Sequence, residues 1–120
     1  MRTFTSGLVL FLAAGALAIA HHGLAAFDQT NKVTLKGTVT AFHFVNPHVV
    51  VEFEVKDDNG HLEKWQAEMT SAGRLKGWTA TSLEPGNVVT VTGYRARSGA
   101  FYLWVTDLSS SNGVELRAPK

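Results

Sequence analysis

Apolar and polar side chains alternate along two stretches of this sequence, and that period of two residues limits the possible folds more than any other feature. Residues 33–41 carry Val, Leu, Gly, Val and Ala at every second position, and residues 49–55 carry Val, Val, Phe and Val. Because successive side chains of a β-strand point to opposite faces, each stretch is predicted to be a strand with one buried face. Gly37 inside the first strand predicts a bulge or a bend.

Turn residues divide the rest of the chain into short segments of the same kind. The run Asp57-Asp58-Asn59-Gly60 predicts a tight hairpin turn, because Asn-Gly tolerates the positive φ that such turns require. A second tight turn is predicted at Ser98-Gly99. The remaining strands are then predicted at residues 62–69, 88–97 and 101–108, with a short edge piece at 114–117.

One segment breaks the alternation, and it is predicted to be a short helix over residues 71–78. Ser71 is a candidate N-cap, and Gly77 could end the helix in the left-handed conformation. Leu75 and Trp78 are three residues apart and would lie on the buried side.

The order of these elements indicates the fold class. Three strands, one short helix and then two or three strands is the order of the small OB-like Greek-key β-barrel, which has its helix between the third and fourth strands. The alternative is a small all-β sandwich, and the position of the single helix favours the barrel. We therefore expect one OB-like barrel domain over residues 33–118.

The first twenty residues predict a secretory signal peptide. Arg2 supplies the positive charge, residues 8–17 form an uncharged apolar run, and Ala18-Ile19-Ala20 is a typical cleavage site. Cleavage after Ala20 would give a periplasmic or secreted protein with no membrane span, and a retained N-terminal anchor is the alternative. Residues 21–32 would then be an N-terminal extension that carries a histidine pair.

Composition excludes several classes of protein. The chain has no cysteine, so disulfides, thiolate metal sites and lipid attachment at the cleavage site are excluded. Without the leader, ten basic and ten acidic residues remain, and a formal charge of zero argues against a nucleic-acid-binding protein.

The histidine pair His21-His22 would begin the mature chain, and this position indicates a metal site. An α-amine has a pKa of about 7.7–8.0, so it is partly neutral near pH 7 and can act as a ligand. The amine and the imidazole of His21 can chelate one ion, an arrangement that resembles the histidine brace of copper proteins. A nitrogen-rich, tetragonal site favours copper over zinc. A polar, loose chain terminus is the competing interpretation.

Two residues elsewhere are candidates to complete that site. His48 follows Asn46-Pro47 at the start of the second strand, where proline stiffens the loop. Glu68 ends the third strand, and pairing about the hairpin turn predicts that it lies opposite residue 50, near His48. It could be a ligand or could orient an imidazole. His43 is a weaker candidate, because a strand residue of this kind is more often partly buried.

Two other functions remain open at this point. The aromatic residues could stack on a flat ligand, for example on Trp65 or Trp104, which would make the barrel a metal-free module that binds a small molecule or a periplasmic protein partner. Catalysis has no positive support, since Ser, Asp and His do not form a recognisable nucleophilic triad. A metal-dependent oxidoreductase that uses the same histidines is the weakest hypothesis.

The ordered set of motifs resembles a known family of small exported bacterial proteins, domain of unknown function family 6152. The resemblance covers essentially the whole mature chain, with Gly23 where a serine is usual and Phe44 where a tryptophan is usual. It implies an exported β-barrel and no established activity. The motifs that carry it are His21-His22, Asn46-Pro47-His48, Trp65-x-x-Glu68, Leu75-x-Gly77-Trp78, Leu83-x-Pro85-Gly86, residues 33–39 and residues 89–93.

Overall fold

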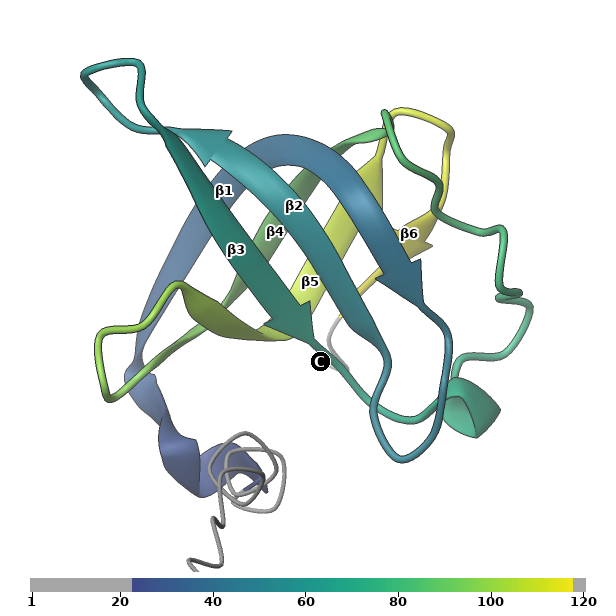
Figure 1. The fold of residues 1–120 in the computed structure, drawn as a ribbon. Helices are drawn as coiled ribbons and strands as arrows, with labels where there is room; N and C mark the ends of the chain where they lie inside the picture. Colours follow the sequence, from purple (N-terminus) through teal and green to yellow (C-terminus); the bar gives the residue numbers. More distant parts are fainter. Residues whose placement is uncertain (1–22, 118–120) are drawn as a thin grey trace, which may run out of the picture.

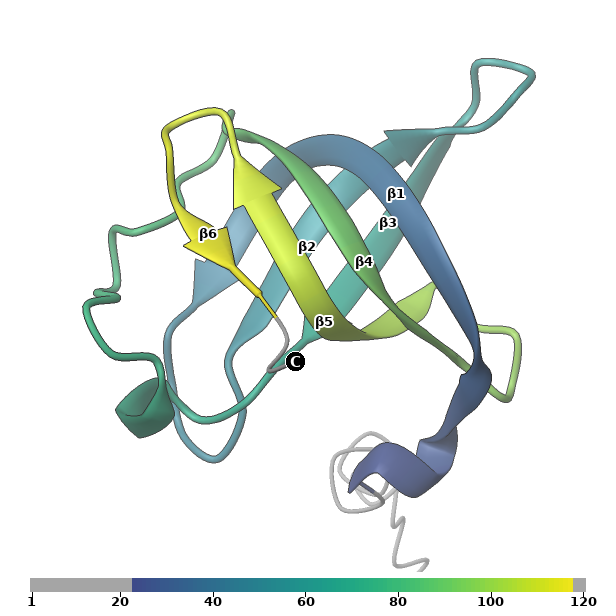
Figure 2. The same ribbon diagram turned by 180° about the vertical axis from the view of Figure 1, so that it is seen from behind.

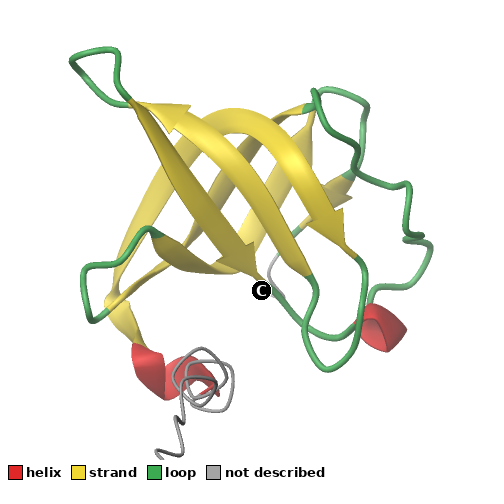
Figure 3. Cartoon of the chain, viewed as in Figure 1, coloured by secondary structure: helices red, strands yellow, loops and turns green. Residues whose placement is uncertain are grey.

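Six β-strands form most of residues 23–117, the part of the chain that the computed structural model describes (Figure 1). Two single turns of 3-10 helix are the helical elements of these residues, and both lie at the periphery of the strands (Figure 3). Neither is long or apolar enough to cross a membrane. In chain order the elements are η2 (Gly23–Ala26), β1 (Phe27–His43), β2 (Val50–Lys56), β3 (Leu62–Glu68), η3 (Ala72–Arg74), β4 (Val88–Ala96), β5 (Tyr102–Ser110) and β6 (Glu115–Leu116).

The strands form a single sheet that closes on itself. Its order is β3-β2-β1-β4-β5-β6, and β3 also pairs with β5, in parallel, through residues 66–68 and 102–104. β1, β2 and β3 form the near wall in Figure 1, and β4 and β5 form the near wall in the reverse view (Figure 2). This closure confirms the predicted OB-like barrel over the sandwich, because a sandwich keeps two separate sheets.

β1 is the long, bent strand that joins the two walls. Its first part pairs with β4 as far as Thr38, and its last part, from Thr38 onward, pairs with β2. Gly37 lies next to this change of partner, at the place where the sequence predicts a bulge or a bend. A side chain there would collide with the backbone carbonyl of Glu54 and the ring of Phe53, so only glycine lets β2 approach so closely. The shift of register itself falls between Val39 and Ala41.

The inward-facing side chains fill the barrel, as the alternation predicts. Val49, Val51 and Phe53 are each at most 1% exposed, while their sequence neighbours are partly exposed. Burial of one such side chain contributes about 1.5–3 kcal/mol, so the packed interior stabilises the fold without disulfides. The rest of the core comes from β1, β3, β4 and β5 and from the segment between β3 and β4. It includes Val39, Trp65, Ala67, Met69, Leu75, Leu83, Val89, Val91, Leu103, Val105 and Leu108.

The start of β1 corrects the sequence analysis. We expected this strand to begin at Val33, but it begins at Phe27 and takes in residues that we assigned to the N-terminal extension. Residues 29–32 are exposed and polar, so they show no alternation from which a strand could be predicted. Pairing with β4 at both ends of the segment, Phe27 with Ala96 and Lys32 with Tyr94, makes it part of the strand, with a break of register between these two pairs.

The helix predicted over residues 71–78 is also corrected. Only Ala72–Arg74 forms a turn, of the 3-10 type, and the Ser71 side chain makes no capping hydrogen bond. Gly73 within the turn weakens a longer helix, and a helix of eight residues is marginal without tertiary support. The position between β3 and β4 is as predicted, Gly77 has the expected positive φ of 81°, and Leu75 is buried.

Candidate functional site

Glu68 is the buried carboxylate of the barrel. It is 3% exposed and is the single charged residue that is buried among residues 23–117. It ends β3 at the seam of the barrel, where Val50 of β2 lies opposite it on one side, as predicted, and Trp104 of β5 on the other. A buried carboxylate costs free energy unless polar partners satisfy it, so its neighbours are the natural place to look for a functional site.

The first partner of Glu68 is His48, in the loop between β1 and β2. Nδ1 of His48 lies 2.5 Å from Oε1 of Glu68, without the alignment of a regular hydrogen bond. The imidazole packs perpendicular to the indole of Trp104, with ring centroids 5.3 Å apart and an interplanar angle of 89°. The ring is therefore fixed on two sides, and its side chain remains 27% exposed.

The loop that carries His48 is held by backbone hydrogen bonds to the segment after β3. Val49 N–H donates to the Thr70 carbonyl at 3.0 Å, and Met69 N–H donates to the Val49 carbonyl at 2.9 Å. The Asn46-Pro47 peptide bond is cis, and the Asn46 side chain accepts a bond from the Gly73 N–H at 3.4 Å. These hydrogen bonds join the loop of His48 to the end of β3 and to the segment that follows it.

The second partner of Glu68 is Tyr102, which the sequence analysis did not select. Its hydroxyl donates a short hydrogen bond to Oε2 of Glu68. Burial, together with this bond to the carboxylate, raises the pKa of Tyr102 well above its ordinary value, so the phenol stays protonated and remains a donor. Tyr102 and Trp104 are two residues apart in β5, so their side chains lie on the same face of the strand. This spacing is the one feature of the sequence that links the two residues.

These contacts give the two ligand candidates, His48 and Glu68, different roles. Oε1 of Glu68 faces His48 and Oε2 accepts from Tyr102, so both oxygens are engaged. Nε2 of His48 has no hydrogen bond or ion pair within residues 23–117. With a proton on Nδ1 facing the carboxylate, Nε2 carries the lone pair and can bind a metal ion or accept a proton. Chemically, His48 is the available group and Glu68 orients it.

The structure does not bring His43 into this site. Its Nε2 lies 2.8 Å from Oε2 of Glu52, and the side chain is 51% exposed. The hydrogen bond from His43 lowers the pKa of Glu52 below its ordinary value. His21 and His22 lie outside the described residues. Within residues 23–117, no three His, Asp or Glu side chains gather as a metal site would require.

Aromatic rings connect the site to the start of β1. Phe27, which is 2% exposed, stacks on Tyr102 with ring centroids 5.5 Å apart and contacts Trp104 at 6.0 Å. Trp104 thus has Phe27 and His48 as ring neighbours. The entry of the chain into the barrel therefore packs against the same rings that support the site.

Two solved structures, each with a TM-score above 0.5, support the fold. The mitochondrial single-stranded DNA binding protein Rim1 from S. cerevisiae superimposes with a TM-score of 0.53 at 13% identity, over 68% of this chain and 93% of Rim1. A deletion mutant of TiaS crystallised with agmatine gives 0.51 at 18% identity, over 78% of this chain and only 24% of TiaS. The N-terminal domain of PriB from Thermoanaerobacter tencongensis has a TM-score of 0.48 at 23% identity, over 68% of this chain and 97% of that domain.

The sequence comparisons identify a family and no activity. A search of curated proteins finds no match. The sequence profile of a family of unknown function, DUF6152, matches residues 9–102, which is most of the chain. Together with the closed sheet, this match shows that the protein is a member of the DUF6152 family with an OB-like β-barrel fold.

Proposed function

We propose that this protein is exported and that the mature form binds one divalent transition metal ion, copper in preference to zinc, through His48 and the terminal histidines His21 and His22. The observation that carries the proposal is the orientation of His48. Its Nδ1 faces a buried carboxylate while Nε2 is free within the described residues. This is the arrangement of metal-binding histidines, which as a rule direct the second ring nitrogen to a carboxylate, a carbonyl or water.

In this proposal Glu68 is a positioning residue and not a ligand. Both of its oxygens are engaged, by His48 and by Tyr102, and the residue is 3% exposed. Such partners fix the tautomer and the direction of the ligating ring and increase its basicity. Tyr102 holds the carboxylate in place and remains protonated throughout the physiological pH range.

The length of the N-terminal segment is compatible with a shared site. His22 precedes Phe27 by five residues, and the four between them form η2, a 3-10 helix that advances about 8 Å at about 2 Å per residue. Phe27 is separated from the ring of His48 by one indole, that of Trp104. With His21 and His22 added at up to about 3.6 Å per residue, this length allows the amine and imidazole of His21 to approach Nε2 of His48. Three nitrogen ligands would favour Cu(II).

The decisive experiment compares two versions of the N-terminus. The full chain is expressed with its leader, the first residue of the purified protein is determined by mass spectrometry, and Cu(II) affinity is measured by competition with a chelator. A second version carries one additional residue before His21, which moves the α-amine away from the imidazole. We expect the first residue to be His21 and the additional residue to weaken binding at least tenfold. Equal affinities would exclude the amine as a ligand.

Histidine variants test the part of the site that the structure describes. His48→Ala is expected to remove most of the Cu(II) affinity, because the other ligands alone leave an incomplete site. His43→Ala and His61→Ala are matched controls, because both side chains are exposed and contact other carboxylates, Glu52 and Asp57. If all three variants bind copper equally, His48 is not a ligand.

A second candidate function has its own observation. A groove of about 820 Å³ crosses β2 and β3, and Phe101 at its rim is 43% exposed and packs on Trp65 with ring centroids 5.0 Å apart. A metal-free module could stack a flat small molecule or a side chain of a protein partner on Phe101. Glu52, Glu54 and Lys64 also line the groove, and the excess of one negative charge disfavours a nucleic acid, although Rim1 is a single-stranded DNA binding protein. Absence of metal from protein dialysed against trace copper and zinc would favour this candidate.

A further inference from the structure

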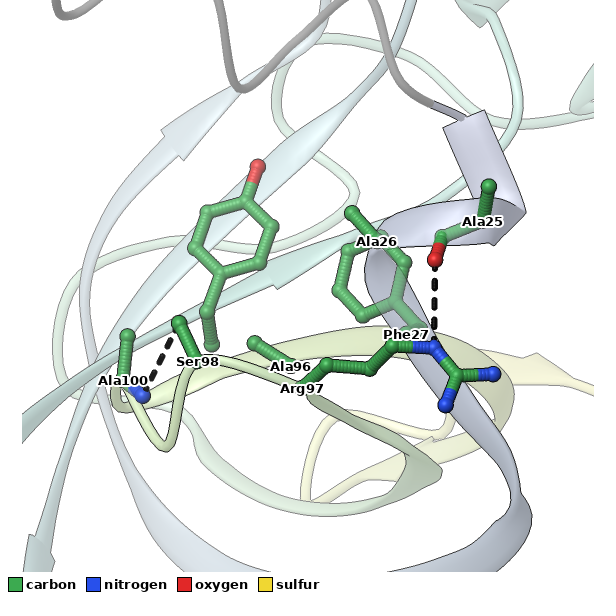
Figure 4. Close-up of a pocket in the computed structure, with 8 residues that line it drawn as sticks. Ala25, Ala26, Phe27, Ala96, Arg97, Ser98 and Ala100 are labelled. Atoms are coloured by element: carbon green, nitrogen blue, oxygen red, sulfur yellow. Dashed lines mark hydrogen bonds between the residues drawn. The ribbon is translucent and has the colours of Figure 1, made fainter.

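A separate cavity of about 370 Å³ lies where the chain enters the barrel, between η2, the end of β4 and the turn that leads to β5 (Figure 4). Four of its lining residues are alanines, at positions 25, 26, 96 and 100, and two are the stacked rings of Phe27 and Tyr102. The short methyl side chains leave room in front of the aromatic pair. The volume and the apolar walls are those of a small-molecule site.

Arg97 gives this cavity a single cationic group. Its backbone N–H donates to the Ala26 carbonyl at 2.9 Å, and Nε donates to the Ala25 carbonyl at 3.2 Å (Figure 4). These two bonds tie η2 to the turn and fix the guanidinium at the edge of the cavity. The two terminal nitrogens of Arg97 make no hydrogen bond within residues 23–117.

The nearest acidic residue does not occupy those nitrogens. Asp28 is close enough for the charge of Arg97 to contribute slightly to its lowered pKa, but the main cause is the hydrogen bond from Thr30. Oδ1 of Asp28 accepts from the Thr30 hydroxyl at 2.6 Å and from the Thr30 N–H at 3.0 Å. The guanidinium therefore keeps two donors in the fixed geometry that suits a carboxylate.

We propose that this cavity binds a small apolar monocarboxylate. The hydrocarbon part packs between the alanine methyl groups and the ring of Phe27, and the carboxylate accepts hydrogen bonds from the terminal nitrogens of Arg97. A sugar or a nucleotide does not fit this chemistry, because the walls offer few polar partners for several hydroxyl or phosphate groups. The cavity contains none of the proposed metal ligands. Tyr102 lines the cavity and also holds Glu68, so Arg97 and Ala100, which have no part in the metal site, are the positions that test this inference separately from metal binding.

The test compares two probes of equal chain length, hexanoate and hexanol, against metal-free protein purified after expression of the full chain. Binding is followed by NMR chemical-shift changes of the backbone amides of residues 25–27 and 96–100. We expect saturable binding of hexanoate at these amides, about tenfold tighter than that of hexanol, because a hydrogen bond to a charged group adds that much. Absence of saturation, or equal affinity for the two probes, would overturn the proposal.

Two variants separate the charge from the cavity. Arg97→Gln is expected to reduce hexanoate affinity to that of hexanol, while Arg74→Gln, a charge change of the same kind at η3, leaves it unchanged. Ala100→Leu places a larger side chain at an exposed position in the turn, so it fills the cavity without disturbing the core and should abolish binding of both probes. Unchanged hexanoate binding by Arg97→Gln or by Ala100→Leu would contradict the assigned site.

Discussion

Two histidine–glutamate pairs in this barrel have the same chemistry but differ in their location and in their exposure to solvent. His48 and Glu68 are 2.5 Å apart at the seam, and the Glu68 side chain is 5% exposed. His43 and Glu52 are 2.8 Å apart on the outer surface, where their side chains are 51% and 37% exposed. The contact distance alone would not distinguish the two pairs. The burial of the carboxylate does.

The comparison shows why one pair is a candidate site and the other is not. Glu68 is buried with Tyr102 on its other oxygen, and the ring of His48 packs perpendicular to that of Trp104. The Glu52 carboxylate accepts from His43 and makes a longer contact with Gln66, and both groups remain in water. A surface pair contributes little because water competes for each partner, whereas removal of one buried partner leaves the other unsatisfied.

The largest expected difference is in stability. Glu68→Ala should lower the free energy of unfolding by about 2–4 kcal/mol, because it leaves Tyr102 and His48 without their shared acceptor. Glu52→Ala should lower it by less than about 0.5 kcal/mol. Urea denaturation of both variants measures the difference. Similar losses in the two variants would show that burial does not distinguish the pairs.

Removal of one hydroxyl tests the contribution of Tyr102. Tyr102→Phe should cost about 1 kcal/mol of stability. If His48 is a metal ligand, the change should also weaken copper binding, by less than the roughly 10–100-fold that loss of a direct partner of the histidine costs, because Tyr102 acts on His48 only through Glu68. Tyr94→Phe is the control, because Tyr94 contacts Lys32 through its ring. A Tyr102→Phe protein that binds copper as tightly as the wild type would contradict the positioning role of Glu68 and Tyr102.

Alkaline pH should reveal the raised pKa of Tyr102. A group whose folded pKa is raised stabilises the protein fully below its unfolded pKa, about 10 for tyrosine, and loses that contribution as pH rises toward the folded value. The stability advantage of the wild type over Tyr102→Phe is therefore expected to be constant at neutral pH and to shrink above pH 10. Thermal unfolding of both proteins across this range measures it, and a constant difference up to pH 12 would disagree.

The smallest effect belongs to the exposed pair. The pKa of Glu52 is lowered, so its contribution to stability is present above its ordinary pKa and is lost as pH falls through the lowered value. His43→Ala should return the pKa of Glu52 toward the ordinary value and change stability at neutral pH only slightly. An NMR titration of the Glu52 side chain follows this shift. An unchanged pKa would mean that His43 does not determine it.

The half of the site that the sequence predicts depends on local rules. The alternation in residues 49–55 and the Asn59-Gly60 turn determine the hairpin register, and this register places Glu68 opposite Val50. Pro47 indicates a stiff loop at His48. These are relations between residues close in sequence, and a period of two is enough to derive them.

The other half depends on closure of the barrel. Tyr102 meets Glu68 because β3 pairs in parallel with β5, a contact between residues 34 apart, and no periodicity specifies it. The same closure buries Glu68, which the sequence analysis gave as a ligand or as a group that orients an imidazole, without predicting its burial. The polar start of β1 could not be predicted for a similar reason, because its partner strand β4 lies about 60 residues later in the sequence.

The seam where β3 meets β5 rests on only three residue pairs, and the bond between Tyr102 and Glu68 crosses it. Any local opening of the barrel at this junction would release the carboxylate and, with it, the imidazole that the carboxylate orients. Amide hydrogen exchange at residues 66–68 would therefore report both events at once. A metal ion bound to His48 would favour the closed junction, because His48 contacts Glu68 only while the junction is closed. Metal binding should therefore slow amide exchange at residues 66–68.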